Sequence, residues 1–161
     1  AYKGLDVLVE AVSLLKREGV AITLGVAGSG EIAAETRATL DRLGAEVINR
    51  WIGDSEISAI LARYDAVVCP HTEASQSGVA AVAFGHAMPV AAMPSGGIVE
   101  QVRECETGVL ASEISARALA DAIGRLAREP GLYDTISRHI AEAAAGRSMP
   151  AFLRAIAALS P

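Results

Sequence analysis

The sequence predicts an α/β fold, in which an open parallel sheet carries helices on both faces. Apolar runs rich in β-branched residues alternate with segments of helical periodicity, which is typical of strand-helix-strand units. Apolar residues make up 52% of the 161 residues, whereas aromatic residues make up only 4%. This composition suits Ala-rich helices packed on Val/Ile strands.

The first half of the chain predicts strands that alternate with helices covering the sheet. The first helix is amphipathic, because apolar residues recur at helical spacing until Gly19 ends the pattern. The expected elements are a helix over 5–18, a strand over 20–27, a helix over 31–43, a strand over 46–52 and a helix, capped by Asp54 or Ser55, that ends near Tyr64.

The second half continues this alternation and then becomes helical. The expected elements are a strand over 65–69, a helix over 79–87, a strand over 89–93, a short helix over 97–104, a short strand over 108–111 and a helical C-terminal tail from Ser115, broken at Pro130 and again near Gly146 and Pro150. Such alternation predicts parallel strands with right-handed crossovers. The apolar stripe over 118–126 is interpreted as facing the core.

The loop after the strand over 65–69 is the most informative part of the chain. In an open parallel sheet, ligands bind where a loop leaves the carboxyl end of a strand and enters a helix. Here the backbone N–H groups of Ser77, Gly78 and Val79 would be unpaired donors of the helix's first turn, and the helix dipole adds positive charge there. The small side chains of this loop let an anion approach closely. The sequence therefore predicts a phosphate site.

Charge and cysteine content exclude several classes of protein. The net charge of −5 argues against a nucleic-acid partner, since such proteins usually present a basic face. The two cysteines, Cys69 and Cys105, imply no disulfide framework and fit a reducing cytoplasm. Cys69-Pro-His71 matches no standard zinc pattern, so no metal site is predicted. No apolar run approaches the roughly 20 residues of a membrane span.

Several motifs in a fixed order resemble one known family. They are Lys3-Gly-Leu-Asp6, Gly28-Ser-Gly30, Trp51-Ile-Gly-Asp-Ser-Glu56, Pro70-His-Thr-Glu73, Ala87-Met-Pro-Val90, Gly96-Gly-Ile-Val-Glu100 and Thr107-Gly-Val-Leu110. Together they look like the C-terminal donor-binding domain of retaining GT-B glycosyltransferases, the large group 1 or family 4 class. The resemblance covers nearly the whole chain and is far more specific than a lone Gly-x-Gly.

The resemblance implies a domain organisation and partners. Residues 1–161 would form a single Rossmann-like domain that binds a nucleotide sugar with UDP or GDP. Because the chain opens in the middle of a motif, we expect it to be a fragment of a longer two-domain enzyme. An N-terminal domain of the same parent chain would then hold the acceptor. The family needs no cofactor and no metal, and peripheral membrane association of the parent is compatible with it.

The family's roles transfer to this sequence residue by residue. Lys3 sits where a lysine contacts the donor diphosphate, and an arginine a few positions earlier would complete the clamp. Ile52 and Asp54 match the strand end where the base rests. Ser77, Gly78 and Val79 match the backbone cradle for the phosphate and the donor sugar.

The family's pair of glutamates is not preserved. Aligned on Pro89, the first glutamate falls at Ala74 and the second, which binds ribose, falls at Val82. Glu73 lies one step before the first position and could serve in its place at the transferred sugar, with Gln76 as the alternative. Val82 cannot accept a hydrogen bond from ribose.

Alternative functions remain open at this stage. One is a non-catalytic nucleotide-sugar-binding or scaffold domain, which Ala74 and Val82 favour. Another is a different GT-B member, such as a nucleotide-sugar epimerase or a glycan phosphorylase, although the only lysines, Lys3 and Lys16, are poorly placed for a pyridoxal cofactor. Two residues are expected to have structural roles instead of binding a ligand. Trp51 is expected to pack against other side chains, and Glu100 is expected to brace the short helix.

Overall fold

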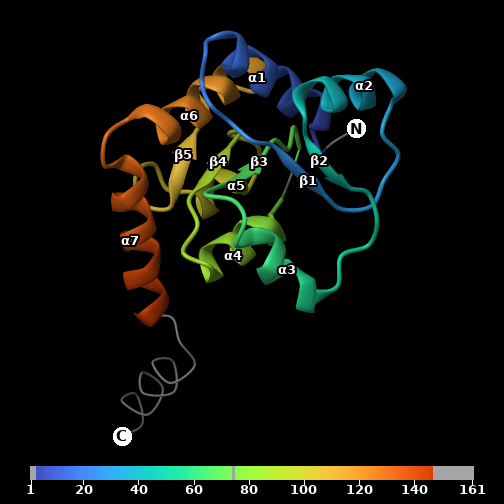
Figure 1. The fold of residues 1–161 in the computed structure, drawn as a ribbon. Coiled ribbons are helices and arrows are strands. Elements are labelled where there is room, and N and C mark those ends of the chain that lie inside the picture. Colours follow the sequence, from blue (N-terminus) through green and yellow to red (C-terminus); the bar gives the residue numbers. More distant parts are fainter. Residues whose placement is uncertain (1–2, 74, 147–161) are drawn as a thin grey trace, which may run out of the picture.

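Helices and strands alternate along the chain as the sequence predicts (Figure 1). The computed structural model describes residues 3–73 and 75–146. The helices are α1 (Leu5–Arg17), α2 (Ala34–Leu43), α3 (Asp54–Leu61), α4 (Gly78–Gly85), α5 (Ile98–Gln101), α6 (Ala116–Arg128) and α7 (Leu132–Gly146). The strands are β1 (Gly25–Ala27), β2 (Glu46–Ile48), β3 (Val67–Cys69), β4 (Val90–Ala92) and β5 (Gly108–Leu110).

All strand pairs within residues 3–73 and 75–146 are parallel, which confirms the predicted α/β class. The strands form two hydrogen-bonded sheets, β1-β2 and β3-β4-β5, rather than one continuous ladder. The Tyr64 side chain packs against β1 at this break: its ring lies so close to Gly25 that a Cβ there would overlap it. The Tyr64 hydroxyl donates to Glu46 Oε2 at 3.1 Å, which anchors the ring beside β1 and β2.

Several elements are shorter than the sequence predicts. The strand expected over 20–27 forms ladder bonds only at β1, and the one expected over 46–52 only at β2. The apolar residues before β1 pack in the core without ladder bonds; Leu24, for example, is buried. The predicted caps Asp54 and Ser55 are wrong, because Gly53 is the N-cap and α3 starts at Asp54. The expected break near Gly146 and Pro150, and the tail beyond it, lie outside the described residues.

Helices cover both faces of the sheets (Figure 1). On one face α1 packs on α2 and α6, and α6 also packs on β4 and β5; on the other, α4 packs on β3 and on α7. One core cluster joins α1 to both sheets, since Val26 of β1 and Val68 of β3 pack against it. Ala118, Leu119 and Ala122 are buried, which confirms the core-facing stripe of α6.

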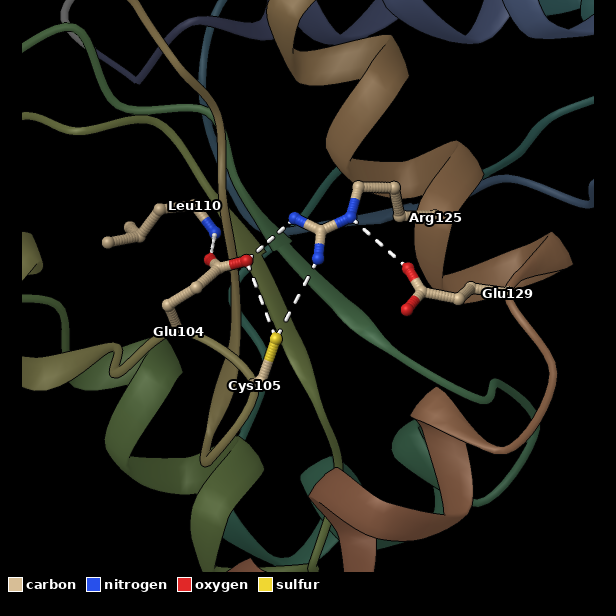
Figure 2. Close-up of polar contacts among 5 residues, drawn as sticks. All are labelled: Glu104, Cys105, Leu110, Arg125 and Glu129. Atoms are coloured by element: carbon tan, nitrogen blue, oxygen red, sulfur yellow. Dashed lines mark hydrogen bonds and ion pairs between the residues drawn. The ribbon is translucent and has the colours of Figure 1, made fainter.

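An ion-pair cluster fastens the α5-β5 loop to α6 (Figure 2). Arg125 donates to Glu104 Oε1 at 2.6 Å, and the other Glu104 oxygen accepts the Leu110 N–H at 2.8 Å. Burial raises the pKa of Glu104, but the Leu110 N–H and the Arg125 charge outweigh it and leave this pKa below its ordinary value. Glu104 thus supplies an acceptor to β5, an edge strand of its sheet.

Two glycines contact the backbone of the β3-α4 loop at different residues. Gly4, which has φ +65, precedes α1 and touches the Pro70 carbonyl, so a Cβ at Gly4 would overlap that oxygen. Gly97, which precedes α5, touches the Ser75 carbonyl in the same way. Only residues without a side chain permit these approaches. The loop position is therefore set by the starts of α1 and α5.

We predict that Gly4→Ala is far more destabilising than Gly19→Ala. Both glycines have positive φ, but nothing lies within 4 Å of a Cβ at Gly19. Left-handed strain of about 1–2 kcal/mol applies to both variants. Overlap with Pro70 adds about 1–3 kcal/mol at Gly4 alone. Urea unfolding of the two variants measures the difference, and equal losses would show that the Pro70 contact does not constrain the fold.

Candidate functional site

A cleft of about 1750 Å³ opens where β1 and β3 are not paired. Residues of both strands and of α1 line its interior. Its rim at the carboxyl ends of the strands brings together segments far apart in the sequence, namely Lys3 and Gly4, Gly28–Gly30, Pro70 and His71, and Val79. This is the end of a parallel sheet at which ligands bind.

Lys3 supplies the cleft's positive charge. It is exposed, directly before Gly4, and is the sole lysine or arginine among the described residues that line the cleft. The other charged groups there are acidic: Asp6, Glu31, Glu35, Glu46 and Asp65. An anion at this site would therefore depend on Lys3 and on backbone donors.

His71 lies close to Lys3, although the two residues come from different elements. Burial, and secondarily the charge of Lys3, lower the pKa of His71 below its ordinary value of 6.5. The imidazole is consequently neutral at pH 7 and adds no second positive charge. Among residues 3–73 and 75–146, no group of His, Cys, Asp and Glu is arranged to hold a metal ion.

The start of α4 matches the predicted phosphate cradle, with one difference. Ser77 is the N-cap, and its Oγ accepts the Ala80 N–H at 3.2 Å. The Ser77 N–H, expected to be unpaired, instead donates to Gln101 Oε1 at 2.8 Å. The N–H groups of Gly78 and Val79 have no hydrogen-bond acceptor among the described residues. The cradle therefore consists of two donors at the N-terminus of an eight-residue helix.

The turn after β1 is held by Asn49, a residue that the sequence analysis did not identify. Asn49 Oδ1 accepts the Gly30 N–H at 3.2 Å, and its Nδ2 donates to the Gly30 carbonyl at 3.0 Å. Gly28 N–H also donates to Ile48 O at 3.1 Å. An amide residue at the end of one strand, beside a Gly-x-Gly turn of the neighbouring strand, is a sequence signal that could have revealed this contact.

Of the predicted base-binding residues, Ile52 lies in the turn between β2 and α3 and Asp54 is the first residue of α3; neither lines the cleft. This turn is shaped by Glu56, which accepts two bonds from Arg50 at 2.9 and 2.6 Å and the Gly53 N–H at 3.2 Å. The Arg50 guanidinium, and then the Gly53 N–H, lower the pKa of Glu56 to about 2. The expectation that Trp51 packs is wrong, because Trp51 is 79% exposed.

The remaining predicted residues lie around the β3-α4 loop. Glu73 and Gln76 are exposed and do not line the cleft, while Ala74 falls outside the described residues. Val82 is half-buried in α4, so an apolar side chain occupies the position of the family's ribose glutamate. Glu100 is exposed, and its carboxylate has no hydrogen-bond or ion-pair partner among the described residues, so the expectation that it braces the short helix is wrong. In the part of the chain that the structure describes, no helix has the length and hydrophobicity to span a membrane.

We predict opposite effects of removing two buried hydroxyls near this loop. Ser77→Ala loses the α4 cap, which costs about 1 kcal/mol. Ser95 is 3% exposed, and its Oγ has no partner among the described residues. Ser95→Ala therefore relieves an unpaired buried hydroxyl and raises the free energy of unfolding by about 1 kcal/mol. Urea unfolding distinguishes the two; equal destabilisation would contradict the assigned contacts.

We also predict that Arg50→Met raises the pKa of Glu56 towards its ordinary value of 4.5, with the Gly53 N–H keeping it somewhat lower. Because the folded pKa is depressed, the pair stabilises the fold above about pH 4.5, and this stabilisation is lost as the pH falls through about 2. A carboxylate titration by NMR measures the shift. Arg37→Met, which removes the partner of Asp41, is the control and leaves Glu56 unchanged.

Solved structures share this fold. Anabaena Alr3699/HepE in complex with UDP and glucose superimposes with a TM-score of 0.74, at 21% identity, over 91% of this chain and 41% of its own. The C-terminal domain of LpcC, a glycosyl transferase group 1 family protein from Francisella tularensis, gives a TM-score of 0.72 at 23% identity, over 91% of this chain and 80% of its own. Both likenesses concern the fold, because the identities are low.

Sequence comparison identifies relatives and a family. D-inositol 3-phosphate glycosyltransferase of Actinosynnema mirum is 31% identical over 147 residues, which cover 84% of this chain and 35% of the relative. The chain thus spans about a third of that relative's length. Residues 1–129 match the family described as Glycosyl transferases group 1. Since that match covers well over half of the chain and the fold agrees with it, the protein belongs to the group 1 glycosyl transferases.

Proposed function

We propose that this domain binds the nucleoside diphosphate of a nucleotide-sugar donor in a retaining sugar transfer. The observation that carries the proposal is the convergence of Lys3 and the α4 N-terminus on one cleft. A single lysine in an otherwise acidic lining, next to two unpaired backbone donors, suits one small anion better than an extended polyanion. A diphosphate meets this description.

The cleft supplies electrostatic stabilisation at the leaving group. As the bond between sugar and phosphate breaks, negative charge builds on the diphosphate. Lys3 and the N–H groups of Gly78 and Val79 offset this charge without reorganising. No metal is required in this scheme, because fixed positive charge already faces the phosphates. The acceptor hydroxyl attacks the same face of the sugar, which retains its configuration.

Two other segments bind the remaining parts of the donor. Ile52 and Asp54 hold the base in the turn that the Arg50-Glu56 pair shapes, and the base is that of UDP or GDP. Glu73 reaches the transferred sugar from the β3-α4 loop, with Gln76 beside it. The ribose receives no carboxylate from α4, because Val82 occupies that position. The diphosphate therefore contributes more to affinity than the ribose does.

The domain acts with a second one in the parent chain. The chain spans 35% of the length of the Actinosynnema relative, and the matching region of LpcC is itself a C-terminal domain. An N-terminal domain then supplies the acceptor, and the domain alone transfers no sugar. Cys69 and Cys105 are free thiols, which suits a cytoplasmic enzyme.

A second candidate is a domain that binds nucleotide sugars without catalysis. The observation that favours it is Val82, an apolar residue at the family's ribose carboxylate position. The two functions differ in turnover, because a purely binding domain still binds the nucleoside diphosphate but does not transfer the sugar.

The test uses the full-length protein with UDP- and GDP-sugars, following release of the nucleoside diphosphate and its binding by calorimetry. We expect Lys3→Ala to weaken UDP or GDP binding about 10–100-fold, because a charged hydrogen bond contributes about 1.5–3 kcal/mol. Lys16→Ala is the matched control, since Lys16 donates to the Leu43 carbonyl, away from the carboxyl-end rim. If the two lysine variants bind UDP or GDP with equal affinity, the proposed site is wrong.

The same assay separates the role of Glu73. Glu73→Gln is expected to lower turnover with little change in UDP or GDP affinity, because a ligand without the sugar does not reach it. Unchanged turnover would make Glu73 a solvated loop residue.

A further inference from the structure

Gln101 connects α5 to Ser77, the residue directly before the two donors of the phosphate cradle. Its Oε1 accepts the Ser77 N–H at 2.8 Å, although the two residues are 24 positions apart. Ser77 is 3% exposed and caps α4. A buried N–H without an acceptor is costly, so this bond fixes where α4 begins.

A second contact from the same side of α5 supports the first. Gly97 touches the Ser75 carbonyl, and Gly97 and Gln101 are four positions apart on one helical turn. Residues at this spacing lie on the same helix face. Gly97, the N-cap of α5, and Gln101, its last residue, therefore hold the two ends of the Ser75–Ser77 segment.

The Gln101 side chain extends from an anchored backbone. Thr107, which is 5% exposed, donates its hydroxyl to the Gln101 carbonyl at 3.4 Å and accepts the Arg103 N–H at 2.8 Å. The end of α5 is thereby fixed to the start of β5. A fixed support of this kind is what precise positioning of a binding group requires.

We propose that Gln101 is a positioning residue for the donor diphosphate, which it never touches. It binds the Ser77 N–H and so presents only the Gly78 and Val79 donors, at a fixed place, to the phosphates. This inference rests on the proposed function. It adds a residue of α5 that acts on the site through α4.

The amide is suited to this role because it is a neutral acceptor. A carboxylate at position 101 would also accept the Ser77 N–H. It would, however, place a negative charge next to the donors that face the phosphates, and like charges repel. Gln101→Glu therefore keeps the hydrogen bond to Ser77 while adding a negative charge beside the donors that face the phosphates.

The experiment compares three variants of the full-length protein. Gln101→Met keeps the length of the side chain but removes the acceptor, and Gln101→Glu keeps the acceptor but adds charge. Ser115→Ala is the matched control: it also removes a side-chain acceptor of a backbone N–H, that of Ala118 at the start of α6, and it has no hydrogen bond with α5 or the cradle. The probes are UDP, GDP, inorganic pyrophosphate, uridine and guanosine, measured by calorimetry beside thermal unfolding.

We expect Gln101→Met to bind the preferred nucleoside diphosphate and pyrophosphate at least tenfold more weakly, with the affinity for the matching nucleoside unchanged. Gln101→Glu should unfold at the wild-type temperature yet bind the diphosphate at least fivefold more weakly. Ser115→Ala should lower the unfolding temperature without changing the ratio of diphosphate to nucleoside affinity. If the role of Gln101 is purely structural, Gln101→Met will behave like Ser115→Ala, with a lower unfolding temperature and an unchanged affinity ratio.

Two outcomes would overturn the inference in distinguishable ways. If the wild-type protein binds UDP or GDP and Gln101→Met binds it equally well, the positioning role is wrong and the proposed function stands. If the wild-type protein binds neither UDP nor GDP, the positioning role and the proposed function are both wrong. Should Gln101→Met not fold, wild-type diphosphate affinity in Gln101→Glu still overturns the role of Gln101.

Discussion

The close contact between Gly4 and the Pro70 carbonyl is the constraint on which the site depends. It joins the start of α1 to the end of β3, two segments that are distant in the sequence. Lys3 immediately precedes this contact, and the β3-α4 loop immediately follows it. The single charged donor and the helix N-terminus therefore share a cleft because two backbones meet without an intervening side chain. The contact is steric, so salt and pH leave it unchanged.

The order and type of the elements could be predicted because burial leaves a periodic pattern. The lengths of the strands could not be predicted, because an apolar run indicates which residues are buried but not which of them form hydrogen bonds in the sheet. Leu24 illustrates this difference: it is buried, yet it lies outside β1. The Tyr64 ring beside Gly25 is likewise invisible in the sequence, because nothing local indicates which glycine an aromatic side chain will cover.

The candidate site was predicted where its features are local, and missed where they are long-range. Backbone donors at Gly78 and Val79 follow from the helix start alone, and Lys3 was identified through its motif. Gln101 could not be found in this way, because its partner is 24 residues away and a glutamine at the end of a short helix usually faces water. Trp51 shows the opposite error: its size suggested packing, but no core forms next to it.

The Glu104 carboxylate has a consequence for how copies of this domain behave towards one another. Strand β5 ends a three-stranded sheet, and an uncovered strand edge is a template on which another chain can add a strand. The Glu104 carboxylate accepts a hydrogen bond from the Leu110 N–H, and its negative charge is held in place by Arg125. The side chain that fastens the loop thus also covers a donor on the open edge of β5 and places a charge there, and both features disfavour the addition of another strand.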